Sequence, residues 1–304
     1  MSEVFTNTLQ QTLLLFIFLL IGALLKIFHV LPDNSARVIS RLEVYVISPA
    51  LSFKTFAARF NVETMHEAGT LMITGLIVLA AVGVISLLIS RFFSRDPYQR
   101  DIYTYSFIIS NYGYIGYALM SALYGEEMLY EMMLFALLIS VFTNSVGFYL
   151  LSPQHKWDLK TIFNPPFVGI LAGMVVGFFK IPLPEFISSA AASASDCMAP
   201  LAMILAGFVI ASRSIPALLK DWKAYIACAI RLLGLPLAGL AISRLLNLPA
   251  NITTVIVVFL AMPMGLNSVV FPESQGGDST TGAKLALISN VAGMITIPLV
   301  LALI

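Results

Sequence analysis

Long apolar runs separated by short polar breaks constrain this chain more than any other feature of its sequence. A helix needs about 20 apolar residues to cross a bilayer. Ten segments approach or meet that length: about 9–30, 38–58, 69–93, 102–124, 127–151, 163–181, 187–212, 222–246, 251–272 and 280–304. Only 11% of the residues are charged, against about 25% in a soluble domain. The sequence therefore predicts an all-α polytopic membrane protein.

The same composition excludes several other classes of protein. The net charge is only +1 and no basic cluster is present, so nucleic acid is not an expected partner. Cys197 and Cys228 both lie in apolar segments, and two cysteines are too few for a disulfide framework or a four-ligand zinc site. The three histidines are scattered over loops and span ends. We therefore expect no metal and no cofactor, and the lipid bilayer as a partner.

The distribution of Lys and Arg predicts the orientation of the spans. Segments at the loops after odd-numbered spans hold twelve of the 17 Lys and Arg residues: Lys26, Arg37, Arg41, Arg91, Arg95, Arg100, Lys156, Lys160, Arg213, Lys220, Lys223 and Lys284. Those after even-numbered spans hold Lys54, Arg59, Lys180 and Arg244. Since cytoplasmic loops carry the excess of positive charge, we expect a plasma (bacterial inner) membrane protein with both termini outside the cytoplasm.

The two halves of the chain resemble each other in the order of their Gly and Pro residues. Three pairs lie 151 or 152 residues apart: Gly22 and Gly173, Pro49 and Pro200, and Gly113 and Gly265. We divide the chain into a first five-helix repeat (1–151), a short cytoplasmic loop (152–162) and a second five-helix repeat (163–304). Because five is odd, the second repeat enters the membrane from the opposite face. Inverted repeats of this kind are typical of secondary transporters.

Spans 4 and 9 combine helix breakers with polar side chains near the middle of the membrane. The candidate binding residues there are Ser110, Asn111, Tyr112, Gly113, Pro263, Met264, Gly265 and Asn267. Two interrupted helices would direct their half-helix N-termini at one point, which attracts an anion. In the alternative interpretation the Gly and Pro residues make tolerated kinks and the Asn residues pack between helices.

Charged residues inside spans are costly and need a partner or a water-filled cavity. Arg231 lies about ten residues into span 8, where it could bind the substrate anion or neutralise helix C-termini. Asp196 lies about nine residues into span 7 and is a coupling-proton candidate or the ion-pair partner of Lys54 or Arg231. Asn144 and Asn290 occupy corresponding places in the two halves and could line a substrate or cation site, or only pack.

The stripe formed by Gly169, Gly173 and Gly177 on span 6 has the small-residue spacing that allows close helix packing. We interpret it as packing within the chain. A homodimer through the same group of helices is the alternative.

These motifs resemble those of the auxin efflux carrier family, which includes the plant PIN-type carriers and short bacterial relatives. The segments that carry the likeness, in order along the whole chain, are Ile47–Phe53, Asn111–Gly116, Phe163–Pro166, Ser195–Asp196, Ala229–Arg231 and Pro263–Gly265. Ser110 stands where the plant carriers have a crossover proline, so the break in span 4 is expected at Gly113. The long cytoplasmic loop of many plant carriers is absent.

The resemblance implies that the interrupted spans 4 and 9 cross at the centre, with a substrate carboxylate held near the crossing. It also implies a scaffold of spans 1, 2, 6 and 7, against which transport helices 3–5 and 8–10 move. We thus expect a carrier of a small organic anion, a mono- or dicarboxylate, that works by elevator-like alternating access. Coupling to a proton or to sodium is open.

Two rival functions are weaker. A cation/proton antiporter on a similar fold needs carboxylates at the crossing, and spans 4, 5, 9 and 10 have none in their middles. An intramembrane hydrolase needs a buried His or a pair of Asp residues, which the spans lack. We therefore do not expect an enzyme.

Overall fold

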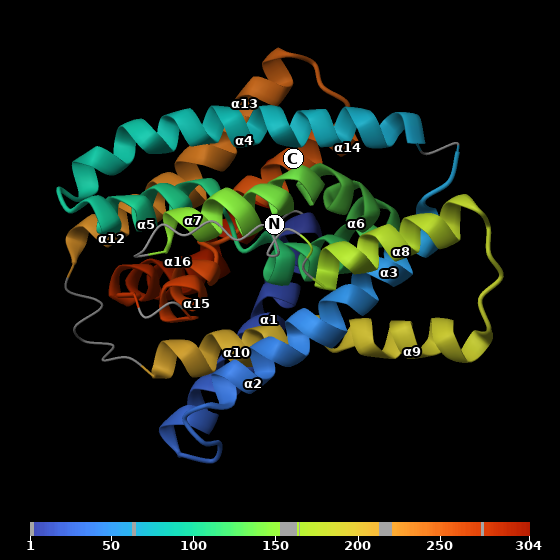
Figure 1. Ribbon diagram of the computed structural model, residues 1–304. Coiled ribbons are helices and arrows are strands. Elements are labelled where there is room, and N and C mark those ends of the chain that lie inside the picture. Colours follow the sequence, from blue (N-terminus) through green and yellow to red (C-terminus); the bar gives the residue numbers. More distant parts are fainter. Residues whose placement is uncertain (1–2, 63–64, 153–162, 164, 213–220, 275–276) are drawn as a thin grey trace.

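The computed structural model describes residues 3–62, 65–152, 163, 165–212, 221–274 and 277–304, and it forms a bundle of helices (Figure 1). Within this part of the chain there is no β-strand, only one isolated bridge between Ser110 and Met264. The predicted loop 152–162 lies outside the described residues except at Ser152.

The first half of the chain contains helices that correspond to predicted spans 1–5. They are α1 (Glu3–Ile27), α2 (Ser35–Leu42), α3 (Ser48–Arg59), α4 (Met65–Phe93), α5 (Pro97–Ile108), α6 (Tyr117–Phe142) and α7 (Phe148–Leu150). Three five-residue π-helices join some of these segments: η1 (Glu43–Ile47), η2 (Tyr112–Gly116) and η3 (Thr143–Gly147). Each π-helix adds a residue to the turn and shifts the face that follows, as often happens at functional sites.

The second half contains α8 (Pro165–Phe178), α9 (Glu185–Asp196), α10 (Met198–Ala211), α12 (Trp222–Ala229), η5 (Ile230–Gly234), α13 (Leu235–Leu245), α14 (Ala250–Ala261), α15 (Asn267–Ser274) and α16 (Thr280–Leu301). The predicted span over 251–272 is therefore divided between α14 and α15.

Six stretches of described helix are long and apolar enough to cross a membrane: Leu9–Ile27, Ala68–Phe93, Tyr117–Leu150, Glu185–Ala211, Trp222–Leu245 and Thr280–Leu301. This confirms a multi-pass, all-helical membrane protein. The number is lower than the ten predicted spans because several apolar segments are short or interrupted; α8 and α14 are apolar helices below 18 residues. Within α6, Gly125 (φ 84°, ψ 178°) breaks the helical path at the predicted boundary between two spans, a conformation that favours glycine.

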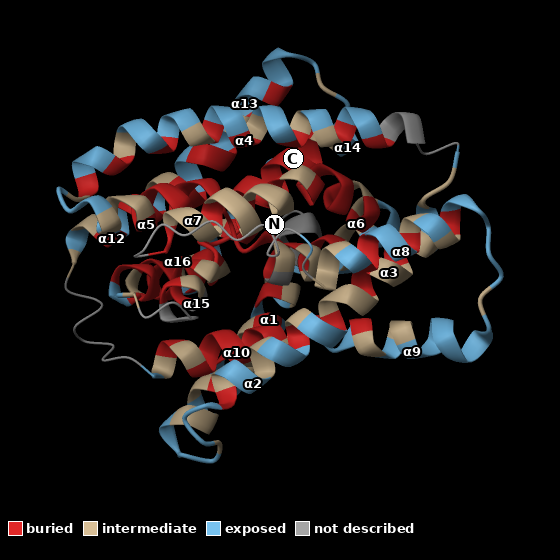
Figure 2. Ribbon diagram, in the orientation of Figure 1, coloured by how far each residue is buried: buried red, intermediate tan, exposed pale blue. Residues whose placement is uncertain are grey.

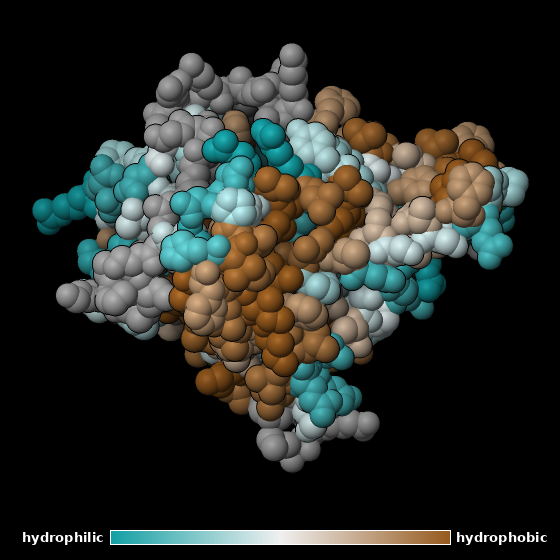
Figure 3. All heavy atoms as spheres, turned by 90° about the horizontal axis from the view of Figure 1, so that it is seen from below, coloured by the Kyte–Doolittle hydropathy of each residue, from teal (hydrophilic) through white to brown (hydrophobic). Residues whose placement is uncertain are grey.

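The outer helices expose large apolar side chains, which the surface helices of a soluble protein rarely do. Buried residues gather in the middle of the bundle, while α4 and α9 present mostly exposed residues (Figure 2). The exposed side chains on α4 are large and apolar, for example Ile73, Ile77 and Leu88. Figure 3 shows a broad hydrophobic area on another face of the molecule. Such surfaces are stable in lipid, where apolar side chains need no cover.

Two helix pairs pack through glycines against backbone. Gly22 of α1 faces the carbonyl of Ile204 on α10, and Gly173 of α8 faces the carbonyl of Phe53 on α3, with no room for a Cβ at either place. Gly169 and Gly177 also face α3, and Figure 1 shows α8 beside α3. The prediction that the glycine stripe packs within the chain is confirmed.

Candidate functional site

The chain leaves helical conformation at two places that lie side by side. Ile109 is extended (φ −101°, ψ 117°) after α5, and Met262 is extended (φ −66°, ψ 147°) after α14. The two extended segments form an antiparallel bridge, in which the N–H of Asn111 donates to the carbonyl of Pro263 at 2.7 Å and the N–H of Gly265 donates to that of Ile109 at 3.2 Å. Backbone groups freed from one helix are thus satisfied by the other, as an apolar membrane interior demands.

The break that follows α5 does not lie at Gly113, where it was expected. It lies at Ile109–Asn111, and Gly113 is part of the π-helix η2 with no positive φ. The expectation that the break rests on Gly113 is therefore wrong. The physical reason is tertiary: hydrogen bonds to Pro263 and Gly265 stabilise the extended backbone where the local sequence contains no breaker.

Arg231 is fully buried behind the bridge and donates hydrogen bonds to the last turns of both α5 and α14. Its Nη1 donates to the carbonyl of Phe107 at 3.1 Å and its Nη2 to that of Phe259 at 3.3 Å. In continuous helices these carbonyls would accept from the N–H groups four residues later. Asn111 instead donates across the bridge, and Pro263 has no N–H. The guanidinium thus fills two acceptor positions that the breaks leave open and lies at two helix C-termini, where a cation is stabilised.

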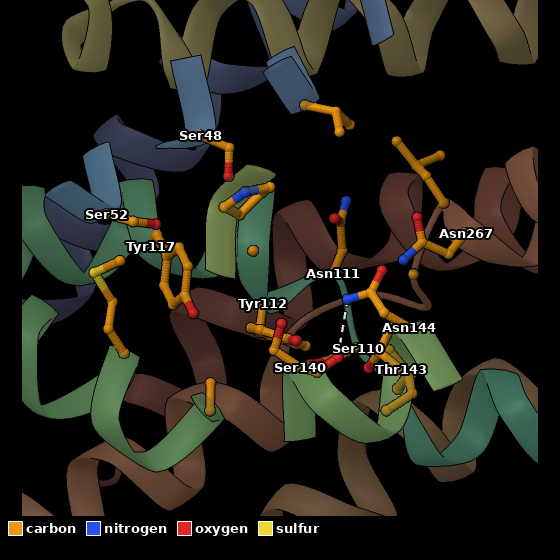
Figure 4. A pocket seen from close by; sticks show the side chains of 18 of the residues that line it. Ser48, Ser52, Ser110, Asn111, Tyr112, Tyr117, Ser140, Thr143, Asn144 and Asn267 are labelled. Atoms are coloured by element: carbon orange, nitrogen blue, oxygen red, sulfur yellow. Dashed lines mark hydrogen bonds between the residues drawn. The ribbon is translucent and has the colours of Figure 1, made fainter. Parts of the chain in front are cut away.

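A cavity of about 220 Å³ adjoins the bridge. Apart from one acidic residue described below, its polar lining, labelled in Figure 4, consists of Ser48, Ser52, Ser110, Asn111, Tyr112, Tyr117, Ser140, Thr143, Asn144 and Asn267. Figure 4 shows the amides of Asn111, Asn144 and Asn267 gathered in one region and the hydroxyl of Ser48 on another side. The cavity is therefore lined by amide and hydroxyl groups from helices of both halves of the chain.

Polar atoms at the bridge lack partners. Among the described residues, Nδ2 of Asn111 and Oγ of Ser110 form no hydrogen bond, although the two residues are only 3% and 2% exposed. Asn111 also precedes η2 without capping it through its side chain. Buried polar groups are nearly always paired in proteins, so these two atoms have unused hydrogen-bonding capacity beside the cavity.

Not all predicted binding residues reach this cavity. The candidates that line it are Ser110, Asn111, Tyr112, Gly113, Asn144, Gly265 and Asn267. Pro263, Met264 and Arg231 lie behind it and support the bridge: the N–H of Met264, for example, donates to Oγ of Ser289 on α16 at 3.1 Å. Asn290 does not line it either; its Nδ2 donates to the carbonyl of Ala286 within α16.

The predicted ion pairs of Asp196 are absent in the described part of the chain. Asp196 is exposed, whereas Lys54 is paired with Glu126 at 3.6 Å and Arg231 contacts only carbonyls. A second cavity of about 220 Å³ is nevertheless lined by Lys54, Glu126 and Asp196 together. The expected pairing does not form, because Lys54 is paired with Glu126 and the side chain of Asp196 is exposed.

One charged residue of the cavity beside the bridge, called the central cavity from here on, was not among the candidates predicted from the sequence. Glu43 lies in η1 of the second predicted span, is 0% exposed and lines the cavity beside the bridge. A signal was present: a single acid about five residues inside an apolar span is a candidate functional residue by itself. Spans 4, 5, 9 and 10 were expected to leave the crossing without a carboxylate, but span 2 places Glu43 in the cavity beside the bridge, which corrects that expectation.

Comparison with known proteins gives consistent matches along the chain. A model of the family described as membrane transport protein matches residues 8–159 and 154–301. An uncharacterized transporter of Methanocaldococcus jannaschii is 24% identical over 302 residues, which cover 96% of this chain and 97% of the relative. One of Methanothermobacter thermautotrophicus is 22% identical over 300 residues, covering 97% and 98%. One of Schizosaccharomyces pombe is 31% identical over 93 residues, covering 31% and 21%.

Proposed function

Because the chain belongs to the membrane transport protein family, the family of the auxin efflux carriers, we propose that it carries a small organic anion across the membrane by elevator-like alternating access. Membership in the family makes the chain a membrane transporter and not an enzyme. The substrate class and the mechanism are our proposal.

The paired helix breaks are the observation that carries the anion proposal. The helices η2 and α15 both begin at the cavity, at Tyr112 and Asn267. The first N–H groups of a helix have no intrahelical acceptor, and its N-terminus carries partial positive charge. In α15 the N–H groups of Ser268 and Val269 already donate to the carbonyls of Gly265 and Leu266. The partial positive charge of the two helix ends and the unpaired Nδ2 of Asn111 therefore favour a carboxylate, with no basic side chain among the described lining residues.

The packing of the helices supports an inverted repeat with a separate scaffold. Gly22 and Gly173, which correspond in the two halves, make the same kind of contact: span 1 packs on span 7 as α1 on α10, and span 6 packs on span 2 as α8 on α3. The helix breaks also fall in corresponding spans. A scaffold of spans 1, 2, 6 and 7 would stay in place while the helices that carry the bridge move past it.

We expect Asn111→Ala to bind carboxylate substrates more weakly without unfolding. Loss of one hydrogen bond costs about 0.5–1.5 kcal/mol, and about 1.5–3 kcal/mol if the partner is charged, which corresponds to about 2- to 100-fold in affinity. Pro→Ala or Gly→Ala changes at the bridge would disturb the fold, so Asn267→Ala is the better companion variant. Unchanged affinity in a well-folded Asn111→Ala protein contradicts the binding role.

Uptake by the purified protein in proteoliposomes tests the function itself. The substrates are labelled lactate and succinate, a mono- and a dicarboxylate, together with other members of each class. Protein-free liposomes correct for passive entry. Saturable uptake of at least one carboxylate, reduced in Asn111→Ala, is expected. Saturable sodium or proton exchange without any carboxylate flux contradicts the proposal.

A cation/proton antiporter is the second candidate because the buried Glu43 lies in the central cavity. A carboxylate there could bind a cation and a proton alternately. The absence of a second acid among the described lining residues speaks against it, since a cation is usually held by several oxygen ligands of which some are charged. The uptake experiment separates the two candidates.

We propose that the loops after odd-numbered spans face the cytoplasm. Val62, which follows span 2 and is 67% exposed, should then react from outside. A single cysteine at position 62 in a background without Cys197 and Cys228 should be labelled by an impermeant thiol reagent in intact cells. One at position 156, outside the described residues, should be labelled only after the membrane is opened. The reverse pattern contradicts this orientation.

A further inference from the structure

Glu43 is a buried acid with no hydrogen-bond partner among the described residues. Its side chain is 0% exposed, and neither Oε1 nor Oε2 forms a hydrogen bond in the described part of the chain. It lies at the first position of η1, where the five-residue turn interrupts the helix that α2 and α3 would otherwise form. An ionised carboxylate in such a place would carry an unpaired buried charge, which costs far more than a neutral carboxyl group.

In the part of the chain that the structure describes, the surroundings of Glu43 contain no compensating base. Glu43 is the only Asp, Glu, Lys, Arg or His among the described residues that line the central cavity, and the other titratable groups there are the phenols of Tyr112 and Tyr117. The helices packed against η1 are α2, α3, α8, α9 and α10. Their acidic and basic residues are Arg37, Arg41, Lys54, Arg59, Glu185 and Asp196.

None of these residues neutralises Glu43. Lys54 is paired with Glu126, and neither it nor any of the others is within hydrogen-bond reach of the Glu43 carboxyl. Arg37, Arg41, Arg59, Glu185 and Asp196 are exposed. Whether the Glu43 carboxyl is protonated or ionised therefore depends on what occupies the cavity.

We propose that Glu43 is the proton-carrying residue of the transporter, and that the substrate anion and a proton on Glu43 occupy the central cavity together. This inference rests on the proposed function. The protonated carboxyl is neutral, so it can donate a hydrogen bond to the substrate carboxylate and does not repel it. Without its proton it repels the anion across a cavity that contains no positive side chain. Binding of the anion and of the proton is consequently cooperative, and each increases the affinity for the other by the same factor.

The position of Glu43 fits this role in an elevator. It belongs to span 2 of the proposed scaffold, whereas Asn111 and Asn267 belong to spans 4 and 9, which carry the bridge and would move. The carboxyl faces the bound anion only when the bridge is at its level. Because Glu43 stays in the scaffold, its proton passes to the carboxylate as the bridge moves away. The substrate then travels as the neutral acid, loses the proton on the other side, and Glu43 takes up another proton from the side where the next anion binds.

Glu43→Gln is the decisive variant, because the amide imitates the protonated acid in shape and neutrality. In the wild type we expect the affinity for the carboxylate to fall by up to about tenfold for each pH unit above the pH at which Glu43 loses its proton. In Glu43→Gln the affinity should be independent of pH, and carboxylate exchange should persist while accumulation driven by a proton gradient is lost. Glu43→Asp keeps a titratable group and should keep a pH dependence.

Infrared spectroscopy tests the proton on Glu43 without any substrate. The C=O stretching band of a protonated carboxyl should be present in the wild type at neutral pH and should lose intensity in Glu43→Gln. Glu127→Gln is the matched control, since Glu127 is an exposed acid away from the cavity, and its band should equal that of the wild type. Thermal unfolding of each variant shows whether it is folded.

The outcomes separate the two hypotheses. Absence of carboxylate transport with the infrared band intact contradicts the proposed function and leaves Glu43 as a protonated group of another transporter. Carboxylate transport that does not respond to a proton gradient, or responds to sodium alone, overturns the proposal on Glu43. The same holds if the infrared band is unchanged in Glu43→Gln, or if Asp196→Asn rather than Glu43→Gln abolishes the proton dependence.

Discussion

Arg231→Ala is expected to lower the stability of the protein by about 2–6 kcal/mol even without substrate. The change leaves the carbonyls of Phe107 and Phe259 without their donors in a buried place, and each unsatisfied group costs about 1–3 kcal/mol. It also leaves a cavity where a large, fully buried side chain was. The measurement is thermal unfolding of the purified protein in detergent, with and without ligand.

Arg244→Ala is the matched control. Arg244 lies in the same predicted span and also donates to a carbonyl, that of Leu303, but it is exposed, so its loss should cost less than about 1 kcal/mol. Arg231→Lys should be intermediate, because an ammonium group does not span two acceptors as a planar guanidinium does. Asp196→Asn should not rescue Arg231→Ala, since Asp196 is not its partner. An Arg231→Ala protein as stable as the wild type, but no longer stabilised by ligand, would show that Arg231 binds the substrate instead.

Gly22→Ala and Gly173→Ala should each destabilise the protein by at least about 2–3 kcal/mol. In both cases the new Cβ would lie closer than 3.0 Å to a backbone carbonyl of the neighbouring helix, and backbone cannot rotate away as a side chain can. The helices α1 and α10, or α8 and α3, must therefore separate along their contact. Unfolding midpoints in detergent measure the effect.

Gly69→Ala and Gly83→Ala on α4 are the controls for this pair. A Cβ at either position meets no atom within 4 Å, and alanine favours a helix interior over glycine by about 1 kcal/mol. These variants should be as stable as the wild type or more so. Equal destabilisation of all four variants would contradict the proposed packing origin, whereas similar losses for Gly22 and Gly173 alone agree with their correspondence in the two halves.

The polar lining of the central cavity was predictable only where the sequence contains a visible anomaly. Asn111 and Asn267 are amides inside apolar spans, and Gly265 is a helix breaker in such a span. All three line the cavity. Glu43 was overlooked although an acid inside an apolar segment is such an anomaly. Ser48, Ser140 and Thr143 carry no comparable signal, because Ser and Thr are common in membrane helices and their hydroxyls can bond to the carbonyl a turn earlier, as Thr143 does to Ile139.

The predicted ion pair of Asp196 shows the limit of arguments from depth along a helix. Counting residues from the end of a span gives a distance from the surface, but it does not give the direction in which a side chain points. The π-helices at 43–47, 112–116, 143–147 and 230–234 change that direction by an extra residue in the turn. They follow from packing in the assembled bundle and leave no sign in local composition.

The sequence by itself determined that this protein is a helical, multi-pass membrane transporter, because long apolar runs have no stable alternative to helices in lipid and because the order of its motifs is that of one family. Only the tertiary structure decided where the helices break and which polar groups meet. The extended conformation at Ile109 depends on hydrogen bonds to a segment more than 150 residues away, and the burial of Arg231 depends on carbonyls from two different helices. Such contacts become favourable only when the helices that supply both partners have packed together.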